Sequence, residues 1–177
     1  QMNSGFRWPY GRREGVLPIA RAANAKGQIV VLDGEKPTRL ADELLSIATH
    51  IVFSADGLRE TEDERDLPTA LRRVATRTRA FVGVTDGVNG MMWLEGDALR
   101  QIPSFRVEVV DTLAAGDVFH GAFALALAER RPIPEAMRFA AATAAIKCTR
   151  FGGGAGTPER TEVEQFLAAH AQNLAFS

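Results

Sequence analysis

Short apolar runs rich in β-branched residues alternate with longer amphipathic segments through the first half of the sequence. The runs are typical of buried strands and lie at 28–34 (QIVVLDG), 50–54 (HIVFS) and 80–87 (AFVGVTDG). The amphipathic segments predict helices at 16–25, 38–49 and 67–78. Alternating strands and helices are joined by right-handed crossovers, which build a largely parallel sheet with helices on both faces. The sequence therefore predicts an α/β fold.

The second half of the sequence is mostly helical. Before the helices, residues 90–97 (GMMWLEGD) and 105–110 predict short strands or a hairpin. Helices are then predicted at 118–130, 134–149 and 161–170, the last with Thr161 and Glu164 as a capping box. The charged stretch 59–66 (RETEDERD) is interpreted as a solvated loop and a first helical turn.

Length and composition indicate a globular protein of one domain. Its 177 residues leave room for one domain of roughly 150 residues. Hydrophobic residues make up 46% and charged residues 24%, which excludes a disordered chain, a collagen and a coiled-coil rod. Residues 1–15 show neither a helical nor a strand period, so we expect an irregular lead-in there and the domain at 16–177.

Charge and cysteine content limit the partners. The 21 Lys and Arg residues against 22 Asp and Glu give a net charge of −1, so no cationic field is available for nucleic acid or anionic lipid. There is no run of about 18 apolar residues and no signal-peptide core. Cys148 is the only cysteine and is expected to be a small core residue, while His50 and His170 have no partners at metal-ligand spacing. We therefore expect a cytoplasmic protein that binds neither nucleic acid nor membrane.

The most informative segment is 109–127 (VVDTLAAGDVFHGAFALAL), where a strand end meets small residues and then an apolar helix. Small residues at Ala114, Ala115 and Gly116 would leave the amides of a helix N-terminus open to an anion. Those amides and the helix dipole would stabilise a phosphoryl group in transfer. Asp117 beside them is the expected general base for a substrate hydroxyl. In the alternative interpretation, the aspartate and threonine side chains of this segment simply cap a helix.

The run 111–124 (DTLAAGDVFHGAFA) resembles the C-terminal signature of the PfkB/ribokinase family of carbohydrate kinases, whose usual form is Asp-Thr-x-Gly-Ala-Gly-Asp. It departs once, at Ala114, and alanine still presents its amide if its φ is negative. The resemblance implies a ribokinase-like three-layer fold and a sugar kinase that uses ATP and Mg²⁺. Asp117 would be the base and the amides of 114–117 the anion hole. His120, one turn into the helix, is expected to be a packing or substrate-side polar group.

Three further segments lie where this family binds its nucleotide. The turn 84–90 (VTDGVNG) resembles the family's Thr-x-Gly strand end, and the loop 151–158 (FGGGAGTP) resembles the loop after the adenine-flanking helix. That helix, at 134–149, has an alanine face with room for a flat base. By themselves, the three segments could equally be a turn, a flexible connection and close helix packing. The implied nucleotide contacts are Thr85, Gly87, Thr112, Ala142, Ala145, Ile146, Gly153 and Gly154.

One family motif is missing in its usual form. In many relatives the strand that matches 50–54 is followed by Asn-x-x-Glu, whose glutamate orients magnesium-bound water. Here residues 54–57 read SADG, so Asp56 or Glu60 is the candidate substitute, and Mg²⁺ is expected to be held mainly by the nucleotide and water. The serine is more typical of a ketohexokinase-like branch, which favours a ketose such as fructose. Similarity to some relatives also implies K⁺ near Asp111 and the 151–157 loop.

The resemblance covers only the C-terminal half of a family member. In complete relatives the preceding half supplies a β-sheet lid, a Gly-Gly substrate motif and an acidic residue for the sugar hydroxyls. We therefore expect a nucleotide site, an anion hole and a base here, but no sugar pocket, and a homodimer would form through the missing lid. Two other functions stay open. One is an inactive nucleotide-binding module; the other, disfavoured because no first strand runs into Gly-x-Gly-x-x-Gly, is an NAD-dependent oxidoreductase.

Overall fold

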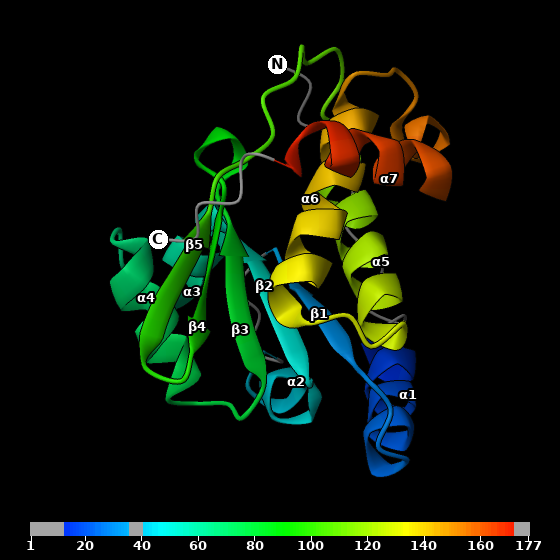
Figure 1. Cartoon of the computed structure of the whole chain (residues 1–177). Helices are drawn as coiled ribbons and strands as arrows, with labels where there is room; N and C mark the ends of the chain where they lie inside the picture. Colours follow the sequence, from blue (N-terminus) through cyan, green and yellow to red (C-terminus); the bar gives the residue numbers. More distant parts are fainter. Residues whose placement is uncertain (1–12, 36–40, 172–177) are drawn as a thin grey trace, which may run out of the picture.

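The computed structural model describes residues 13–35 and 41–171, and Figure 1 shows how their helices and strands are arranged. The described strands are β1 (Val31–Gly34), β2 (His50–Ser54), β3 (Phe81–Thr85), β4 (Met91–Glu95) and β5 (Ala98–Ile102). The described helices are α1 (Arg13–Ala25), α2 (Ala41–Ile47), α3 (Ala55–Glu62), α4 (Leu67–Ala75), α5 (Ala115–Ala128), α6 (Ile133–Cys148) and α7 (Arg160–Ala169). Two short 3₁₀ helices, η2 (Gly87–Asn89) and η3 (Gly153–Gly156), lie in glycine-containing loops.

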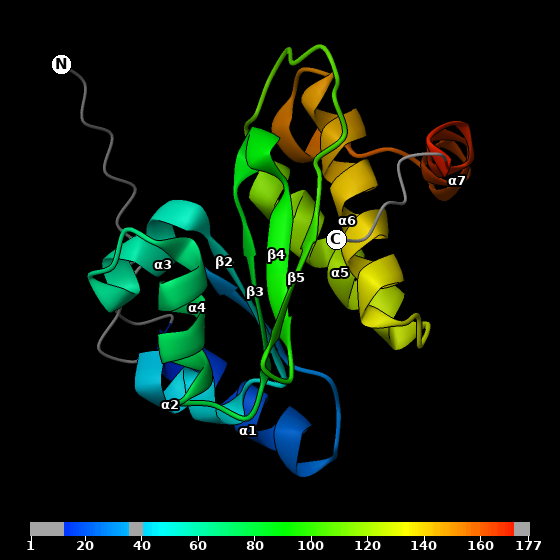
Figure 2. The same ribbon diagram turned by 60° about the vertical axis from the view of Figure 1, so that its left-hand side comes forward.

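The described strands form one sheet in the order β1-β2-β3-β4-β5. β1, β2 and β3 are parallel, with Val31 opposite His50 and His50 opposite Phe81, and β4 and β5 continue the sheet as an antiparallel hairpin. Figure 2 shows three layers, with α3 and α4 on one face of the sheet and α5 and α6 on the other. The predicted α/β fold with helices on both faces is confirmed, and its parallel part comprises β1 to β3.

The sheet is buried on both faces at β2, which explains the uninterrupted apolar run in this strand. Ile51 and Phe53 belong to a core cluster with residues of α3 and α4, whereas Val52 between them belongs to a second cluster with Phe123 of α5 and Met137 of α6. Successive side chains of a strand point to opposite faces, so a strand covered on both sides is apolar at every position.

Helix α3 is not among the helices that the sequence predicts. It begins at Ser54, whose hydroxyl oxygen accepts a hydrogen bond from the amide of Gly57 at 3.0 Å, and it ends before Asp63, which has a φ of 47°. Its buried residues are Ala55, Gly57 and Leu58. Three buried positions within polar sequence are too few to show a helical period. The predicted solvated stretch 59–66 therefore starts inside a helix.

Residues 105–110 do not form the predicted strand. The amides of Val110 and Asp111 instead donate to the carbonyl oxygen of Cys148, at 2.8 and 3.1 Å. This part of the backbone is thus held by the end of α6 rather than by the sheet.

Several helix starts also differ from the predictions, and α5 begins at Ala115, three residues before the predicted start. Helix α1 begins at Arg13, inside the predicted lead-in, while residues 1–12 and the predicted helix start at 38 lie outside the described residues. In α7 the capping box is formed by Glu159 and Glu162, because the helix begins at Arg160, one residue earlier than predicted; the pair Thr161 and Glu164 is wrong.

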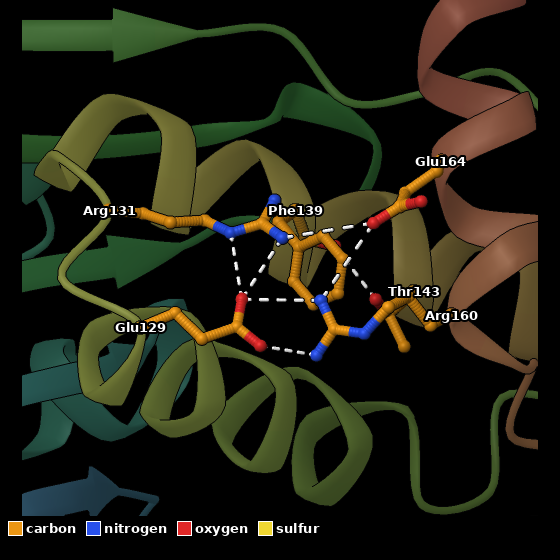
Figure 3. Close-up of polar contacts among 6 residues, drawn as sticks. All are labelled: Glu129, Arg131, Phe139, Thr143, Arg160 and Glu164. Carbon is orange, nitrogen blue, oxygen red and sulfur yellow. Dashed lines mark hydrogen bonds and ion pairs between the residues drawn. The ribbon is translucent and has the colours of Figure 1, made fainter.

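A network of charged side chains joins α7 to the α5–α6 pair (Figure 3). The carboxylate of Glu129 accepts hydrogen bonds from Arg131, at 3.0 Å, and from Arg160. Glu164 lies 3.8 Å from Arg160. Both guanidinium groups lie over the ring of Phe139, at 4.5 and 5.8 Å from its centroid. Because α7 is held in this way, the glycine-rich loop before it is anchored at both ends.

His50, at the start of β2, makes stability depend on pH. Its half-buried ring lies 5.7 Å from the ring of Phe81 and 5.9 Å from that of Phe123, and burial lowers its pKa below the ordinary 6.5. In acid the unfolded state therefore binds more protons than the folded state, so stability should fall as pH decreases from about 7 to about 5. Urea unfolding midpoints across this range measure the slope. His50→Phe should make the slope shallower, and an unchanged slope would contradict this role of His50.

Candidate functional site

Helix α5 begins at a tight backbone bend that leaves amide groups open. Ala114, immediately before the helix, has a left-handed conformation with φ of 62° and ψ of 16°. The amide of Ala115 donates to the carbonyl oxygen of Thr112 at 3.1 Å. Within the described chain, the amides of Gly116 and Asp117 have no hydrogen-bond partner, and both residues are exposed. Open amides at the positive end of a helix dipole can bind an anion.

Two expectations about this bend are corrected. The amide of Ala115 cannot belong to the anion hole in this conformation, because it closes a turn with Thr112. The φ of Ala114 is positive rather than negative, so this alanine occupies a conformation that costs little only for glycine. The open amides are therefore those of Ala114, Gly116 and Asp117, none of which has a partner among the described residues.

The carboxylate of Asp111 holds the bend in place. Its Oδ1 accepts a hydrogen bond from the amide of Leu113 at 2.9 Å, and its Oδ2 accepts from the amides of Gly152 at 3.2 Å and Gly153 at 3.5 Å. The pKa of Asp111 lies below its ordinary value, chiefly because of the Leu113 amide, with smaller contributions from the two glycine amides and the charge of Lys147. One ionised side chain thus joins the signature bend to the glycine-rich loop.

A first cavity of about 350 Å³ opens between the ends of β3 and β4, the start of α5 and one face of α6. Four residues predicted to contact the nucleotide line it: Thr85, Gly87, Thr112 and Ala145. Phe105, Val107 and Val109, which the sequence does not mark as site residues, complete its apolar wall. A mostly apolar cavity that ends at open amides suits a flat heterocycle attached to phosphates.

Two predicted contacts on α6 lie in the core instead. Ala142 is 0% exposed and Ile146 is 8% exposed, and both belong to the cluster between α6, α5 and the sheet. The cavity is lined by Ala141, Ala144, Ala145 and Cys148. Each residue of an α-helix is rotated by about 100° from the one before, so neighbours of a cavity-lining residue can face the core.

A second cavity, of about 630 Å³, lies on the other side of the α5 start, between α5, α6 and α7. Asp117, Ala114 and Gly154 line it. Gly153, also a predicted nucleotide contact, is a buried residue of the loop and lines neither cavity. The first turn of α5 therefore lies between the two cavities, with Gly116 at the first and Asp117 at the second.

His120 ties α5 to the sheet. Its Nδ1 lies 2.8 Å from the carbonyl oxygen of Gly116, and its Nε2 lies 3.0 Å from that of Val52 in β2. Carbonyl oxygens only accept hydrogen bonds, so both ring nitrogens can donate only when the ring carries two protons and a positive charge. Asp33, in β1, lies 3.5 Å from Nδ1. The pKa of Asp33 is raised above its ordinary value, chiefly by burial. Nearby carboxylates, including that of Asp117, raise it further, while His120 opposes the rise.

The two candidate substitutes for the magnesium-orienting glutamate lie outside both cavities. Asp56 forms a surface ion pair within α3 and its side chain is 89% exposed, and Glu60 is also exposed. Ser54, at the motif's first position, caps α3. Residues 54–60 thus serve the helix start and present no carboxylate to either cavity.

The described residues offer little for protein-bound metal or thiol chemistry. Across 13–35 and 41–171, no three or more His, Cys, Asp and Glu side chains gather closely enough to hold a metal ion. Burial raises the pKa of Cys148, which is half-buried at the first cavity rather than in the core. In the same part of the chain, no helix has the length and apolar character to cross a bilayer.

Known proteins of one family resemble this chain. Residues 8–160 match the pfkB family carbohydrate kinases. The ribokinase of Haemophilus influenzae is 35% identical over 158 residues, which cover 86% of this chain and 52% of that protein. The ribokinase of Arabidopsis thaliana, solved in complex with ribose and ATP, matches with a TM-score of 0.78 and 28% identity over 85% of this chain and 51% of that one. A candidate ribokinase from Agrobacterium tumefaciens matches with a TM-score of 0.83 and 36% identity, over 90% and 53%.

These similarities fix both the fold and the family. The architecture is that of a ribokinase-like α/β protein. The chain belongs to the pfkB family of carbohydrate kinases, as the signature at 111–124 indicates. It spans about half the length of the relatives that it matches.

Replacing Ala114 by glycine should stabilise the protein. A non-glycine residue in the left-handed region costs about 1–2 kcal/mol, and the greater freedom of glycine in the unfolded chain offsets part of this gain, so we expect about 0.5–1 kcal/mol. Urea unfolding measures the change. Ala124→Gly, inside α5, is the matched control and should destabilise by about 1 kcal/mol. A lower midpoint for Ala114→Gly would be incompatible with the positive φ.

Proposed function

We propose that this chain supplies the nucleotide site and the general base of an ATP-dependent kinase that phosphorylates a sugar hydroxyl. The observation that carries the proposal is the start of α5, where open amides lie between two cavities and Asp117 lines the second. Membership of a carbohydrate kinase family supports the reaction class. The ribokinase relatives favour ribose as acceptor over the ketose expected from the serine at position 54.

The open amides would hold the phosphoryl group during transfer. Those of Gly116 and Asp117 lie in the first turn of α5, where the helix dipole adds positive potential. In phosphoryl transfer the negative charge is spread over three equatorial oxygens, and donors that are already in position stabilise it without reorganisation. The hydrogen bonds of Asp111 to Leu113 and the glycine loop supply this preorganisation.

The first cavity would take the rest of the nucleotide. Its alanine wall on α6 leaves space for a flat base, and Thr85 and Gly87 lie at its β3 end, where phosphates and ribose would pass. The ATP complex of the Arabidopsis ribokinase supports ATP as the donor. Mg²⁺ would be held by the nucleotide phosphates and water, since Asp56 and Glu60 line neither cavity. The ion would supply positive charge that neutralises the phosphoryl oxygens.

Asp117 would remove the proton from the acceptor. As the sugar oxygen attacks the γ-phosphorus, its proton passes to the Asp117 carboxylate, and the bond from the γ-phosphorus to the bridging oxygen breaks to release ADP. His120 holds this turn of the helix to β2 through Gly116 and Val52, which fixes the position of the base. Because the chain spans about half of its relatives, we assign part of the sugar contacts to the segment that corresponds to their other half.

Asp117→Asn tests the base. In the complete protein it should lower ribose-dependent ADP formation by about 10²–10⁴-fold, the usual contribution of a general base, because the amide cannot accept the proton. ATP affinity, measured by calorimetry, should change little because the backbone amides remain. Asp97→Asn, in the exposed β4–β5 turn, is the control and should keep wild-type turnover.

Two results would redirect the proposal. Unchanged turnover by Asp117→Asn would remove the base assignment. A complete protein that ATP stabilises against heat, but that forms no ADP with any sugar, would be a non-catalytic nucleotide-binding module.

A further inference from the structure

Lys147, in the last turn of α6, is a buried cation that the proposed chemistry does not use. Its side chain is 0% exposed. The Nζ donates a hydrogen bond to the main-chain oxygen of Asp111 at 2.8 Å and lies 3.5 Å from Asp111 Oδ2. Removing an ammonium group from water is unfavourable unless oxygen atoms replace the lost hydration. Both oxygens that do so here belong to Asp111.

The surroundings favour a positive charge at this point. Asp111 is the one carboxylate within ion-pair distance of Lys147 in the described part of the chain. The ammonium is also carried by the C-terminal turn of α6, where the helix dipole is negative. Through Asp111 it is linked to the amides of Leu113, Gly152 and Gly153.

The K⁺ ion implied by resemblance does not fit beside this ammonium. Protein-bound K⁺ needs several oxygen ligands that replace its hydration shell. At Asp111 the ammonium takes the main-chain oxygen and lies next to Oδ2, while three amides bond to the carboxylate. A second cation within a few ångströms of a buried ammonium would be strongly repelled.

We infer that the ammonium of Lys147 takes the place of a monovalent cation at Asp111, so that the protein binds its nucleotide without K⁺. Lys147 lines neither cavity and is therefore a positioning residue. It connects α6, which also lines the first cavity, to the bend before α5 and to the glycine-rich loop. The nucleotide part of this inference rests on the proposed function; the part that concerns stability does not.

The wild-type protein provides the first test. Its melting temperature and its ATP affinity are measured in KCl, NaCl and tetramethylammonium chloride at one ionic strength. Both quantities should be the same in the three salts. A melting temperature or an ATP affinity that rises specifically in KCl would overturn the inference.

Substitution of Lys147 provides the second test. Lys147→Ala removes the ammonium and opens space beside Asp111, so in tetramethylammonium chloride the melting temperature should fall by about 10 °C, as for other broken buried ion pairs. KCl should restore part of this loss and part of the lost ATP affinity. Lys147→Met removes the charge but fills the space, so it should lose stability without recovery in KCl. Lys26→Ala, which removes an exposed lysine, should match the wild type in every salt.

The remaining outcomes are also decisive. A Lys147→Ala protein that is as stable as the wild type, or that does not respond to KCl, would overturn the inference. If neither variant folds, the salt comparison of the wild type decides alone. Failure of the proposed function is a different result, because ATP would then not bind in any salt while the melting temperatures still followed the expected pattern.

Discussion

The candidate site depends on the ionised carboxylate of Asp111. It binds the amide of Leu113, the amides of the glycine-rich loop and the ammonium of Lys147, so it joins the bend before α5 to the end of α6 and the loop that follows α6. Hydrogen bonds to the charged form keep its pKa low, which keeps these contacts in place at neutral pH. With the bend fixed, α5 starts beside the first cavity with its first amides open.

The electrostatics of the α5 start combine charges of both signs over a short distance. The carboxylate of Asp117 is close enough to raise the pKa of Asp33. The ring of His120, whose two nitrogens both contact carbonyl oxygens, lies beside Asp33. A negative phosphoryl group brought to this point would be unfavourable next to the carboxylates alone. The open amides and the helix dipole would offset that repulsion, so the proposed anion site is compatible with a base beside it.

Sequence patterns predict the structure correctly where burial imposes a period on the residues, and they fail where it does not. The strands at 50–54 and 80–87 and the signature segment could be predicted, because apolar runs and small residues reflect burial and backbone access directly. The cavity-lining face of α6 could not, since alanines on nearly all sides of this helix give no contrast that marks its orientation. Lys147 could not be assigned either, because its partner is 36 residues away. The positive φ of Ala114 is a property of the folded bend and has no signal in the residue itself.

Helix α5 differs from α3 and α4 in how it starts. Ser54 and Asp66 cap α3 and α4 with their side chains, whereas Ala114 has no group that could cap α5. A helix without a cap has a less stable first turn, and an anion at its open amides satisfies the donors that a serine or aspartate would otherwise bind. Under the proposed function, a bound phosphate group would supply the cap that the residue before α5 does not provide.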